Sequence, residues 1–343
     1  MREKKRNKGF VEEISDEELL KKVKYYGKKI NEVKKEVHKG MVGQDEVINS
    51  VLKCLVCRGH VLLESVPGLA KTLLARLLTK TVKQANFQRI QFTPDLLPTD
   101  ITGVTVYEKG KGFYTVKGPI FANIILGDEI NRAPPKVQSA MLQAMEERQV
   151  TIGRQTFDLP RPFFVMATEN PLEQKGVYPL AVAQVDRFLF KVFVDYPKEK
   201  EEIIISEQNI EVKTIEDFGI KKVIDPKEIL EIQEVVKKIK LSEELKKYIV
   251  DIIDATRYPD NYGMVEEKKY ISYGASPRAS IYLALAAKAT ALMDNRIYVT
   301  PKDIRNVAKE VLRHRIILNY EGKAREISTD SIIDEIIKRV PVL

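Results

Sequence analysis

Residues 64–72 read E-S-V-P-G-L-A-K-T and contain the types of side chain that hold phosphate. The amine of Lys71 and the hydroxyl of Thr72 stand directly before a helical pattern, L-L-A-R-L-L, so the loop amides and the helix dipole converge on one point. Gly68 gives the middle of the loop its backbone freedom, and Pro67 stiffens the turn. The stretch predicts a phosphate-binding loop, with an ordinary turn that ends in Lys-Thr as the alternative.

Two positions depart from the phosphate-loop pattern G-x-x-x-x-G-K-[ST]. Ser65 and Ala70 occupy the places of its two glycines. Ala70 is compatible with the site if its φ is negative, because its methyl group can then point away from the phosphates, and Ser65 is compatible if its backbone lies outside the left-handed region. Ser65 is the more serious departure, because it opens the loop.

A second group of candidate residues ends the run I-I-L-G-D-E at residues 124–129, which is typical of a buried strand followed by two carboxylates. Phosphoryl transfer needs a carboxylate near magnesium and a group that orients the attacking water. We assign the first role to Asp128, with the Thr72 hydroxyl on the same ion, and the second role to Glu129. Two acids at a strand end are common by themselves, and the Lys-Thr loop upstream is what favours the catalytic interpretation.

A third strand-like run ends in M-A-T-E-N-P at residues 166–171. We expect its strand to lie between the loop strand and the acid strand. Asn170 would then hold the attacking water or sense the γ-phosphate. An Asn-Pro turn without a catalytic role is the alternative.

The elements that must position these residues follow from hydrophobic patterns. Apolar runs typical of strands occupy residues 61–63, 87–92, 121–126, 163–168 and 188–194, and they alternate with helical patterns. This alternation predicts a mostly parallel sheet covered by helices on both faces. Beyond Pro197 the patterns are almost entirely helical, at residues 198–208, 226–239, 241–257, 276–294 and 300–318. The predicted fold class is therefore α/β, an αβα core followed by a helical domain.

The same patterns divide the chain into three parts. Residues 1–36 form a charged helical extension, whose helical pattern covers residues 10–38 and has a weak point or break at Gly27. Residues 37–197 form the αβα core, and residues 198–343 form the helical domain. No internal repeat or low-complexity tract is evident.

Composition limits the possible classes of protein. The 343 residues are 44% hydrophobic and carry a net charge of +8, but lysines and glutamates alternate along the chain, which is typical of a solvated surface rather than a nucleic-acid site. No run approaches the ~20 apolar residues of a membrane helix, and no signal peptide is evident, so we expect a soluble, cytoplasmic protein. Cys54 and Cys57 lie in an apolar helical run, which favours buried small side chains over a zinc or redox site.

Several longer motifs resemble those of one family. The run D-E-I-N-R-A-P-P-K-V-Q-S-A-M-L-Q-A-M-E-E-R-Q-V-T is similar to the signature of the MoxR-type AAA+ ATPases, as are V-P-G-L-A-K-T, A-T-E-N-P-L-E-Q-K-G-V-Y-P-L-A-V-A-Q-V-D-R-F, G-A-S-P-R-A-S and V-L-R-H-R. The resemblance covers residues 42–318. It implies an AAA+ P-loop core with a helical lid, and ATP or ADP with Mg²⁺ bound between subunits of a homo-oligomeric ring, commonly a hexamer.

The resemblance also implies site residues. Arg187 in V-D-R-F matches the candidate arginine finger, and Arg278 in S-P-R matches the sensor arginine of the lid; both enter our catalytic set with Glu129 and Asn170. Alanine before the lysine is usual in this family, whereas glycine is usual at the position of Ser65. The residues that we expect to bind the nucleotide are Val42, Gly43 and Gln44 beside the adenine and Val66, Pro67, Gly68, Leu69, Ala70, Lys71 and Thr72 in the loop.

Two insertions match this branch of AAA+ proteins. Residues 93–120 interrupt the second core helix, and residues 148–161 read as a β-hairpin around Gly153 and Arg154. Such projections could grip a substrate at the centre of a ring, although a plain surface hairpin is equally compatible with the sequence.

Three functions remain open at this point. The resemblance favours a remodelling chaperone that acts on a protein substrate together with a separate partner bearing a von Willebrand factor A domain. A nucleic-acid motor would need basic and aromatic residues gathered on the hairpins, and the 148–161 hairpin has only Phe157 as an aromatic. A nucleotide-gated scaffold with little hydrolysis is favoured by Ser65 alone.

Overall fold

A five-stranded parallel sheet forms the centre of the computed structural model, which describes residues 14–173, 176–208 and 214–342. The strands lie in the order β2-β5-β8-β1-β9, and every neighbouring pair is parallel. Their bounds are β1 Val61–Glu64, β2 Phe87–Gln91, β5 Ile124–Asp128, β8 Phe164–Glu169 and β9 Phe190–Phe193. The predicted α/β class is confirmed, and β8 lies between β1 and β5 as expected.

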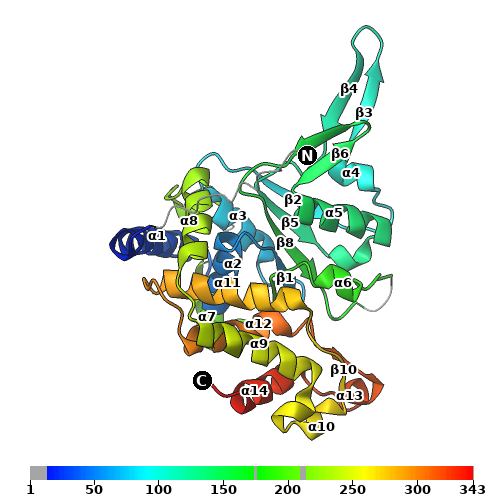
Figure 1. Ribbon diagram of the computed structural model, residues 1–343. Coiled ribbons are helices and arrows are strands. Elements are labelled where there is room, and N and C mark those ends of the chain that lie inside the picture. The colour runs from blue at the N-terminus through cyan, green and yellow to red at the C-terminus, as the bar shows by residue number, and fades with distance from the viewer. Residues whose placement is uncertain (1–13, 174–175, 209–213, 343) are drawn as a thin grey trace, which may run out of the picture.

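Alternate residues of the strands face two different helix layers, because side chains point to opposite faces of a sheet with a period of two. Leu63 and Leu126 pack in the hydrophobic core on the side of α2 (Asp45–Val56) and α3 (Lys71–Thr81). Leu62 and Ile125 pack in a second core with α5 (Pro135–Glu147). Figure 1 shows these layers on either side of the sheet.

Two hairpins extend from the core beyond β2 and α5. Between β2 and β5 the chain forms α4 (Pro98–Thr102) and the antiparallel pair β3 (Gly103–Glu108) and β4 (Gly112–Lys117). The second hairpin pairs β6 (Gln149–Ile152) with β7 (Gln155–Asp158). The β3–β4 hairpin projects far from the body of the molecule (Figure 1).

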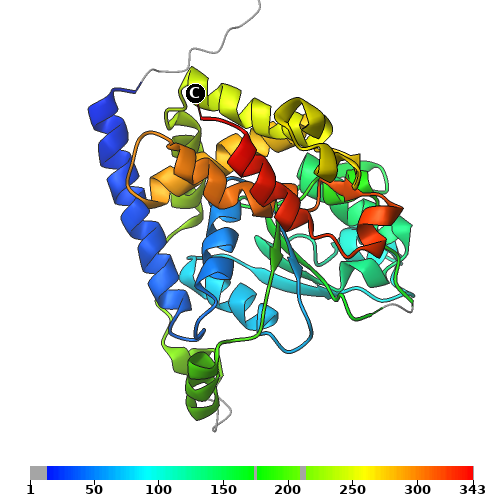
Figure 2. The same cartoon turned by 90° about the horizontal axis from the view of Figure 1, so that it is seen from below.

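The rest of the chain is mostly helical. After the short α6 (Val182–Val185) and β9 come α7 (Glu199–Gln208), α8 (Pro226–Lys238), α9 (Glu243–Arg257), α10 (Val265–Lys268), α11 (Pro277–Met293), α12 (Pro301–Leu312), α13 (Tyr320–Ala324) and α14 (Thr329–Arg339). The helical pattern expected to reach residue 318 ends at Leu312, and β10 (Ile271–Tyr273) pairs with β11 (Ile317–Leu318) instead. Figure 2 shows these helices stacked beside the sheet. No helix of the described residues is both long and apolar enough to cross a membrane.

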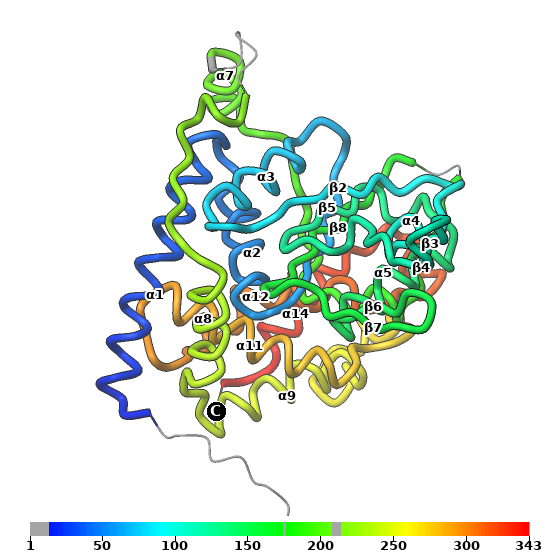
Figure 3. The backbone as a smooth tube through the Cα atoms, turned by 90° about the horizontal axis from the view of Figure 1, so that it is seen from above, coloured from blue at the N-terminus to red at the C-terminus, as the bar shows by residue number. Residues whose placement is uncertain are grey.

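Helix α1 (Asp16–Val37) is continuous, so the break expected at Gly27 is wrong. The first four residues of the expected helix, 10–13, lie outside the described residues. Gly27 is buried against α11 and the turn that follows it, where a Cβ atom would lie 2.4 Å from Asn295 Oδ1. The missing side chain lets the two helices approach closely. α1 runs along the edge of the molecule past α3 and α8 (Figure 3), and its apolar side chains join the main core.

Candidate functional site

The predicted phosphate loop connects β1 to α3, which begins at Lys71. Gly68 has φ of 86° and Ala70 has φ of 52°, so the condition of a negative φ, under which alanine would be tolerated without strain, is not met. Ala70 occupies the N-cap position of α3, where the chain turns sharply from the loop into the helix. A left-handed alanine costs roughly 1–2 kcal/mol, which the surrounding loop and helix must offset. Ser65 does not have positive φ, so its condition is met, and it is buried.

The Lys71 amine turns back into the loop. It donates hydrogen bonds to Ser65 Oγ at 2.5 Å and to the carbonyl oxygen of Val66 at 3.1 Å. Burial lowers the pKa of Lys71, and the nearby carboxylates of Asp128 and Glu129 partly oppose that effect. Lys71 and the two acids at the end of β5 therefore interact electrostatically, although β8 lies between β1 and β5 and the residues are 57 or more positions apart in the sequence.

Asp128 ends β5 and is held on both of its oxygens. Oδ1 accepts a hydrogen bond from Thr168 Oγ1 at 2.7 Å, and Oδ2 accepts from Arg89 Nη2 at 2.6 Å and Nε at 3.2 Å. Arg89 comes from the edge strand β2. This contact was not predicted, because the sequence of a strand does not show which residue of the neighbouring strand a long side chain reaches. Thr168, on β8, was missed for the same reason.

Glu129 follows directly in a left-handed conformation, with φ of 58°. Its Oε2 accepts hydrogen bonds from Gln91 Nε2 and Arg132 Nη1, each at 2.9 Å. Its backbone N–H donates to Thr168 Oγ1 at 2.8 Å. The β2 strand therefore contacts both acids, Asp128 through Arg89 and Glu129 through Gln91.

Asn170 is buried immediately beyond β8, between the ends of β1 and β5. Its Oδ1 accepts a hydrogen bond from the N–H of Leu172 at 3.1 Å. The side chain thus stabilises its own Asn-Pro turn, which is the role that the alternative interpretation gives it. That bond uses the oxygen and does not conflict with a role for the amide nitrogen.

A cavity of about 460 Å³ adjoins the loop on the side of α7. Pro67, Gly68, Leu69 and Ala70 form one wall together with Leu73 of α3. The other walls come from residues near the start of α2 and after β9: Gly40, Met41, Val42, Gln44, Tyr196, Pro197, Glu202 and Ile205. Val42 and Gln44 border the cavity as expected. Gly43 has φ of 66° and packs against the Glu201 carboxylate.

Tyr196, Glu202 and Ile205 belong to the cavity but were missed in the sequence. The first two are exposed, and no spacing in Y-P-K-E-K-E-E distinguishes them from surface residues. Gln44 fastens this segment to the start of α2, because its Nε2 donates to the carbonyl oxygen of Asp195 at 2.8 Å.

Arg187 and Arg278 lie together, away from the loop. Arg187 Nε contacts Glu146 Oε2 at 2.9 Å, and Arg278 Nη2 contacts Glu146 Oε1 at 3.0 Å. Arg187 precedes β9, whose first residue is in register with the first residue of β1, whereas the loop follows the end of β1. The strands alone separate these two edges by about 10 Å. Within one chain the structure does not bring the two arginines to the phosphate loop.

The residues around this arginine pair fix it to the helical domain. Asp186 Oδ1 contacts the buried Arg315 at 2.8 Å, and its Oδ2 accepts a hydrogen bond from Ser276 Oγ at 3.0 Å. Arg278 Nη1 lies 3.5 Å from the same carboxylate. Arg315 also donates to the carbonyl oxygens of Phe188 and Leu189. The lid-side Arg278 and the core-side Arg187 are thus held as one unit.

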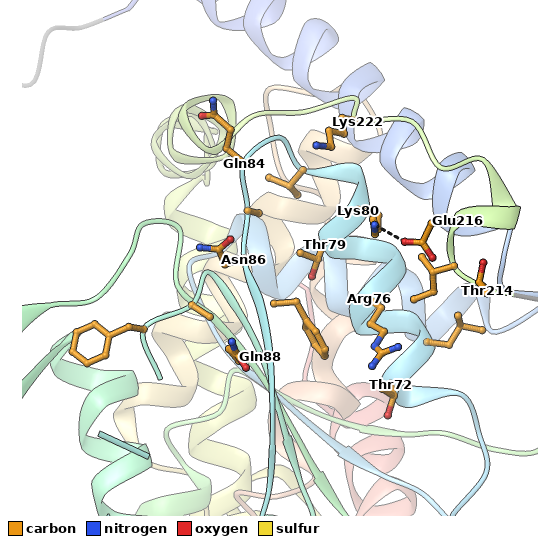
Figure 4. Close-up of a pocket in the computed structure, with 17 residues that line it drawn as sticks. Thr72, Arg76, Thr79, Lys80, Gln84, Asn86, Gln88, Thr214, Glu216 and Lys222 are labelled. Atoms are coloured by element: carbon orange, nitrogen blue, oxygen red, sulfur yellow. Dashed lines mark hydrogen bonds and ion pairs between the residues drawn. The ribbon is translucent and has the colours of Figure 1, made fainter. Parts of the chain in front are cut away.

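A groove of about 1060 Å³ begins at Thr72 and follows α3 along the edge of the sheet. Figure 4 shows Thr72, Arg76 and Lys80 along one side of this groove and Asn86 and Gln88 along another, with the contact between Lys80 and Glu216 dashed. The Thr72 end of α3 therefore borders an open groove as well as the 460 Å³ cavity, and Leu73 lines both.

These residues fit a magnesium nucleotide. The Asp128 carboxylate and the Thr72 hydroxyl are hard oxygen ligands of the kind that Mg²⁺ takes, and the half-buried Lys71 provides a cation for phosphate. The cavity beside the loop falls within the usual range for small-molecule sites. Oδ2 of Asp128 is in contact with Arg89, so a metal ligand role requires that contact to be exchanged.

Comparisons with known proteins agree on one family. Residues 60–190 match the model of the "ATPase family associated with various cellular activities (AAA)", and residues 265–336 match the AAA lid domain. The chain is 46% identical to Chaperone MoxR1 of Mycobacterium tuberculosis over 89% of this chain and 80% of that protein. It is 31% identical to Protein MoxR of Paracoccus denitrificans over 88% and 93%. A solved structure of a putative ATPase from Cytophaga hutchinsonii superposes with a TM-score of 0.88 at 48% identity, covering 94% of this chain and 97% of that one.

Proposed function

Because the chain belongs to the MoxR family of AAA+ ATPases, we propose that it binds ATP in the cavity beside residues 66–72 and hydrolyses it to ADP and phosphate. One observation carries this proposal. Lys71 at the start of α3 lies close enough to Asp128 and Glu129, at and just after the end of β5 in the same parallel sheet, to interact with them electrostatically. Ligands of open α/β sheets bind at this edge, beyond the carboxyl ends of the strands.

In this proposal the loop binds the phosphates, and the acids bind the metal ion and act on the attacking water. Lys71 exchanges its bonds to the loop for the β- and γ-phosphates. Asp128 and Thr72 would hold Mg²⁺, which neutralises developing charge on the phosphate oxygens. Glu129 orients the attacking water or takes a proton from it. This role fits because Glu129 directly follows Asp128 and its carboxylate is only partly buried. Asn170, between β1 and β5, is placed to hold the same water or to sense the γ-phosphate.

The two arginines act on the site of a neighbouring subunit. Support comes from their position at the edge of the sheet opposite to their own loop, and from the single acid, Glu146, that holds both of them. In a ring, that edge of one subunit would meet the open flank of α3 in the next. The guanidinium groups of Arg187 and Arg278 would then exchange Glu146 for the neighbour's γ-phosphate. An arginine supplied in this way accelerates nucleotide hydrolysis by roughly 10³–10⁵.

The cellular role in this proposal is remodelling of a protein substrate. One relative is named Chaperone MoxR1, and we extend that description to this chain. The proposal includes a homo-oligomeric ring, a hexamer in the simplest case, a separate partner with a von Willebrand factor A domain, and a cytoplasmic location.

Glu129→Gln tests the catalytic assignment. We expect turnover of ATP to fall by at least about a hundredfold, as is typical when a general base is lost, with ATP binding preserved because the amide keeps the size of the side chain. Hydrolysis is measured as phosphate release and binding by fluorescence of a labelled ATP analogue. Unchanged turnover would remove Glu129 from its role, and lost binding would mean that the variant damages the site. Glu147→Gln, on an exposed helix end, is the matched control.

A further inference from the structure

Two carboxylates lie side by side at the carboxyl edge of the sheet, directly before residues of the proposed site. Glu64 ends β1 and Glu169 ends β8, and the two residues are paired in register. Ser65 of the loop follows Glu64, and Asn170 follows Glu169. The two acidic side chains are only 25% and 17% exposed. Like charges directly opposite one another destabilise neighbouring strands, so this pair of acids needs a cation.

Lys191 of β9 supplies that cation. Its Nζ lies 2.5 Å from Glu64 Oε2 and 4.0 Å from Glu169 Oε2. Lys191 is in register with Leu62, two positions before Glu64, and therefore lies on the same face of the sheet as that acid. In the part of the chain that the structure describes, no second lysine or arginine lies within ion-pair distance of either carboxylate.

The electrostatics of Glu169 depend on this lysine. Burial raises the pKa of Glu169, the charge of Lys191 opposes that effect, and the charge of Glu64 adds to it. Without Lys191, two mostly buried carboxylates would face each other with no opposite charge between them.

The groups next to Lys191 do not take its place. Arg313, directly after α12, donates to the carbonyl oxygen of Lys191 at 3.3 Å, but its guanidinium is held by Asp330 at 2.8 Å. His314 is buried, and burial lowers its pKa well below the ordinary value, so it stays neutral. Lys191 is therefore the cation on which the two acids depend.

The backbone at the same strand ends ties the phosphate loop to the strand that carries Asn170. The N–H of Ser65 donates to the carbonyl oxygen of Glu169 at 3.1 Å. The N–H of Val194, after β9, donates to the carbonyl oxygen of Glu64 at 3.0 Å. Repulsion between the two acids would act directly on these bonds, and so on the distance between the loop and Asn170.

We propose that Lys191 is a positioning residue of the nucleotide site, whose amine holds the Glu64 and Glu169 carboxylates together and thereby keeps the phosphate loop beside Asn170. This proposal rests on the proposed ATPase function and adds a residue that acts through two acids. An ion pair with a merely structural role would add stability without setting the pH dependence of activity, and the two cases can be separated.

The test first removes the cation and then removes the repulsion. Lys191→Met deletes the charge and nearly keeps the length of the side chain, and a double variant combines it with Glu169→Gln. Lys246→Met, which breaks an exposed pair with Glu243 on α9, is the matched control. For each full-length chain, phosphate release and the dissociation constant of a labelled ATP analogue are measured between about pH 6 and about pH 8, on either side of neutrality. Urea unfolding confirms that each variant is folded.

At the upper end of this range we expect Lys191→Met to lower turnover at least about tenfold and to weaken binding of the analogue, because small displacements of reacting groups are costly. As the pH falls, Glu169 of this variant takes up a proton, since no lysine lowers its pKa, and the repulsion disappears. Its activity should therefore rise relative to that of the original chain. The double variant should recover most of the loss at every pH, and Lys246→Met should behave like the original chain.

Unchanged turnover and binding in Lys191→Met would overturn the proposal. So would a loss that is equal at every pH and is not restored by Glu169→Gln, which is the pattern of a merely structural ion pair. An original chain that binds the analogue without hydrolysing ATP would refute the ATPase proposal alone, because the dissociation constants would still show or lack the same pH dependence and the same rescue. An original chain that does not bind the analogue would overturn both proposals.

Discussion

Ser65 is the residue at which this phosphate loop differs most from its pattern, and the structure shows what it contacts. Its hydroxyl accepts a hydrogen bond from the Lys71 amine, and we propose that the lysine must give up this bond to meet phosphate. We predict that Ser65→Gly strengthens ATP binding by about fivefold, the effect of removing one competing hydrogen bond. The dissociation constant of a labelled ATP analogue measures this change.

Ser65→Ala separates the two possible causes of that effect. It removes the hydroxyl but keeps the Cβ atom, so it should strengthen ATP binding as glycine does if the hydrogen bond is responsible. Equal affinity of all three chains would show that Ser65 does not restrain Lys71.

The buried His60 should make the stability of the fold depend on pH. Burial lowers the pKa of this side chain to about 4, and Nδ1 accepts a hydrogen bond from the N–H of Val165 at 3.0 Å, so only the neutral ring fits. The unfolded chain binds a proton near pH 6.5 and the folded chain does not, so stability is complete above pH 6.5 and falls as the pH drops toward 4. The shift corresponds to roughly 3 kcal/mol.

The measurement is urea unfolding at several pH values between 7 and 4. His60→Gln should be less stable at pH 7 but should lose less free energy of unfolding on acidification than the original chain. His314 is also buried with a lowered pKa and acts in the same direction, so part of the dependence should remain. Parallel pH curves for the two chains would contradict this account of His60.

For single residues, the sequence predicts which side chains belong to the site better than it predicts their contacts. Lys71, Asp128 and Glu129 can be selected because their chemistry and their place after apolar runs agree. The contacts of Arg89 and Gln91 cannot, because they depend on which strand lies beside β5. The left-handed backbone of Ala70 was also unpredictable, since it follows from where α3 begins rather than from any preference of alanine.

Among the elements, helix α1 should contribute measurably to the free energy of unfolding. It packs against α3, α8 and α11 through one apolar face that includes Val23 and Ile30. We predict that Ile30→Ala lowers the free energy of unfolding by about 2–5 kcal/mol, as for other buried truncations. Lys28→Ala, on the exposed face of the same helix, should change it by less than about 0.5 kcal/mol. Urea denaturation of the two variants provides the comparison, and equal effects would mean that α1 does not belong to the cooperative unit.

The elements themselves were predicted well where hydrophobic period was strong. All five apolar runs overlap strands of the central sheet. The inner strands β1, β5 and β8 are almost entirely apolar because they are covered on both faces, whereas the edge strand β2 exposes Gln88 and Arg89. The prediction of a break at Gly27 was wrong because tertiary packing outweighs the low helix propensity of one glycine. The exposure of the aromatics of β3 and β4 could not be predicted, because V-T-V-Y and F-Y-T-V are equally typical of strands that pack on a core.

At the scale of the whole molecule, we propose that each chain carries two complementary halves of one shared site. The loop and acids lie at the carboxyl edge of the sheet, and the arginine pair lies at the amino edge beside the helical domain. Arg315 and Asp186 couple that pair to both parts of the chain. A closed ring of identical subunits is the simplest arrangement that joins every loop to an arginine pair.

Mixing two inactive chains tests this claim most directly. Lys71→Ala removes the phosphate contact of one chain, and Arg187→Ala removes the arginine of another, so each variant alone should hydrolyse ATP at least about a hundredfold more slowly than the original chain. In a mixture, the Lys71→Ala subunits still present Arg187 to the intact loops of the Arg187→Ala subunits. We predict that the mixture recovers a substantial fraction of the original activity, with a maximum near equal amounts of the two. Activity no higher than the sum of the separate chains would contradict a site shared between subunits.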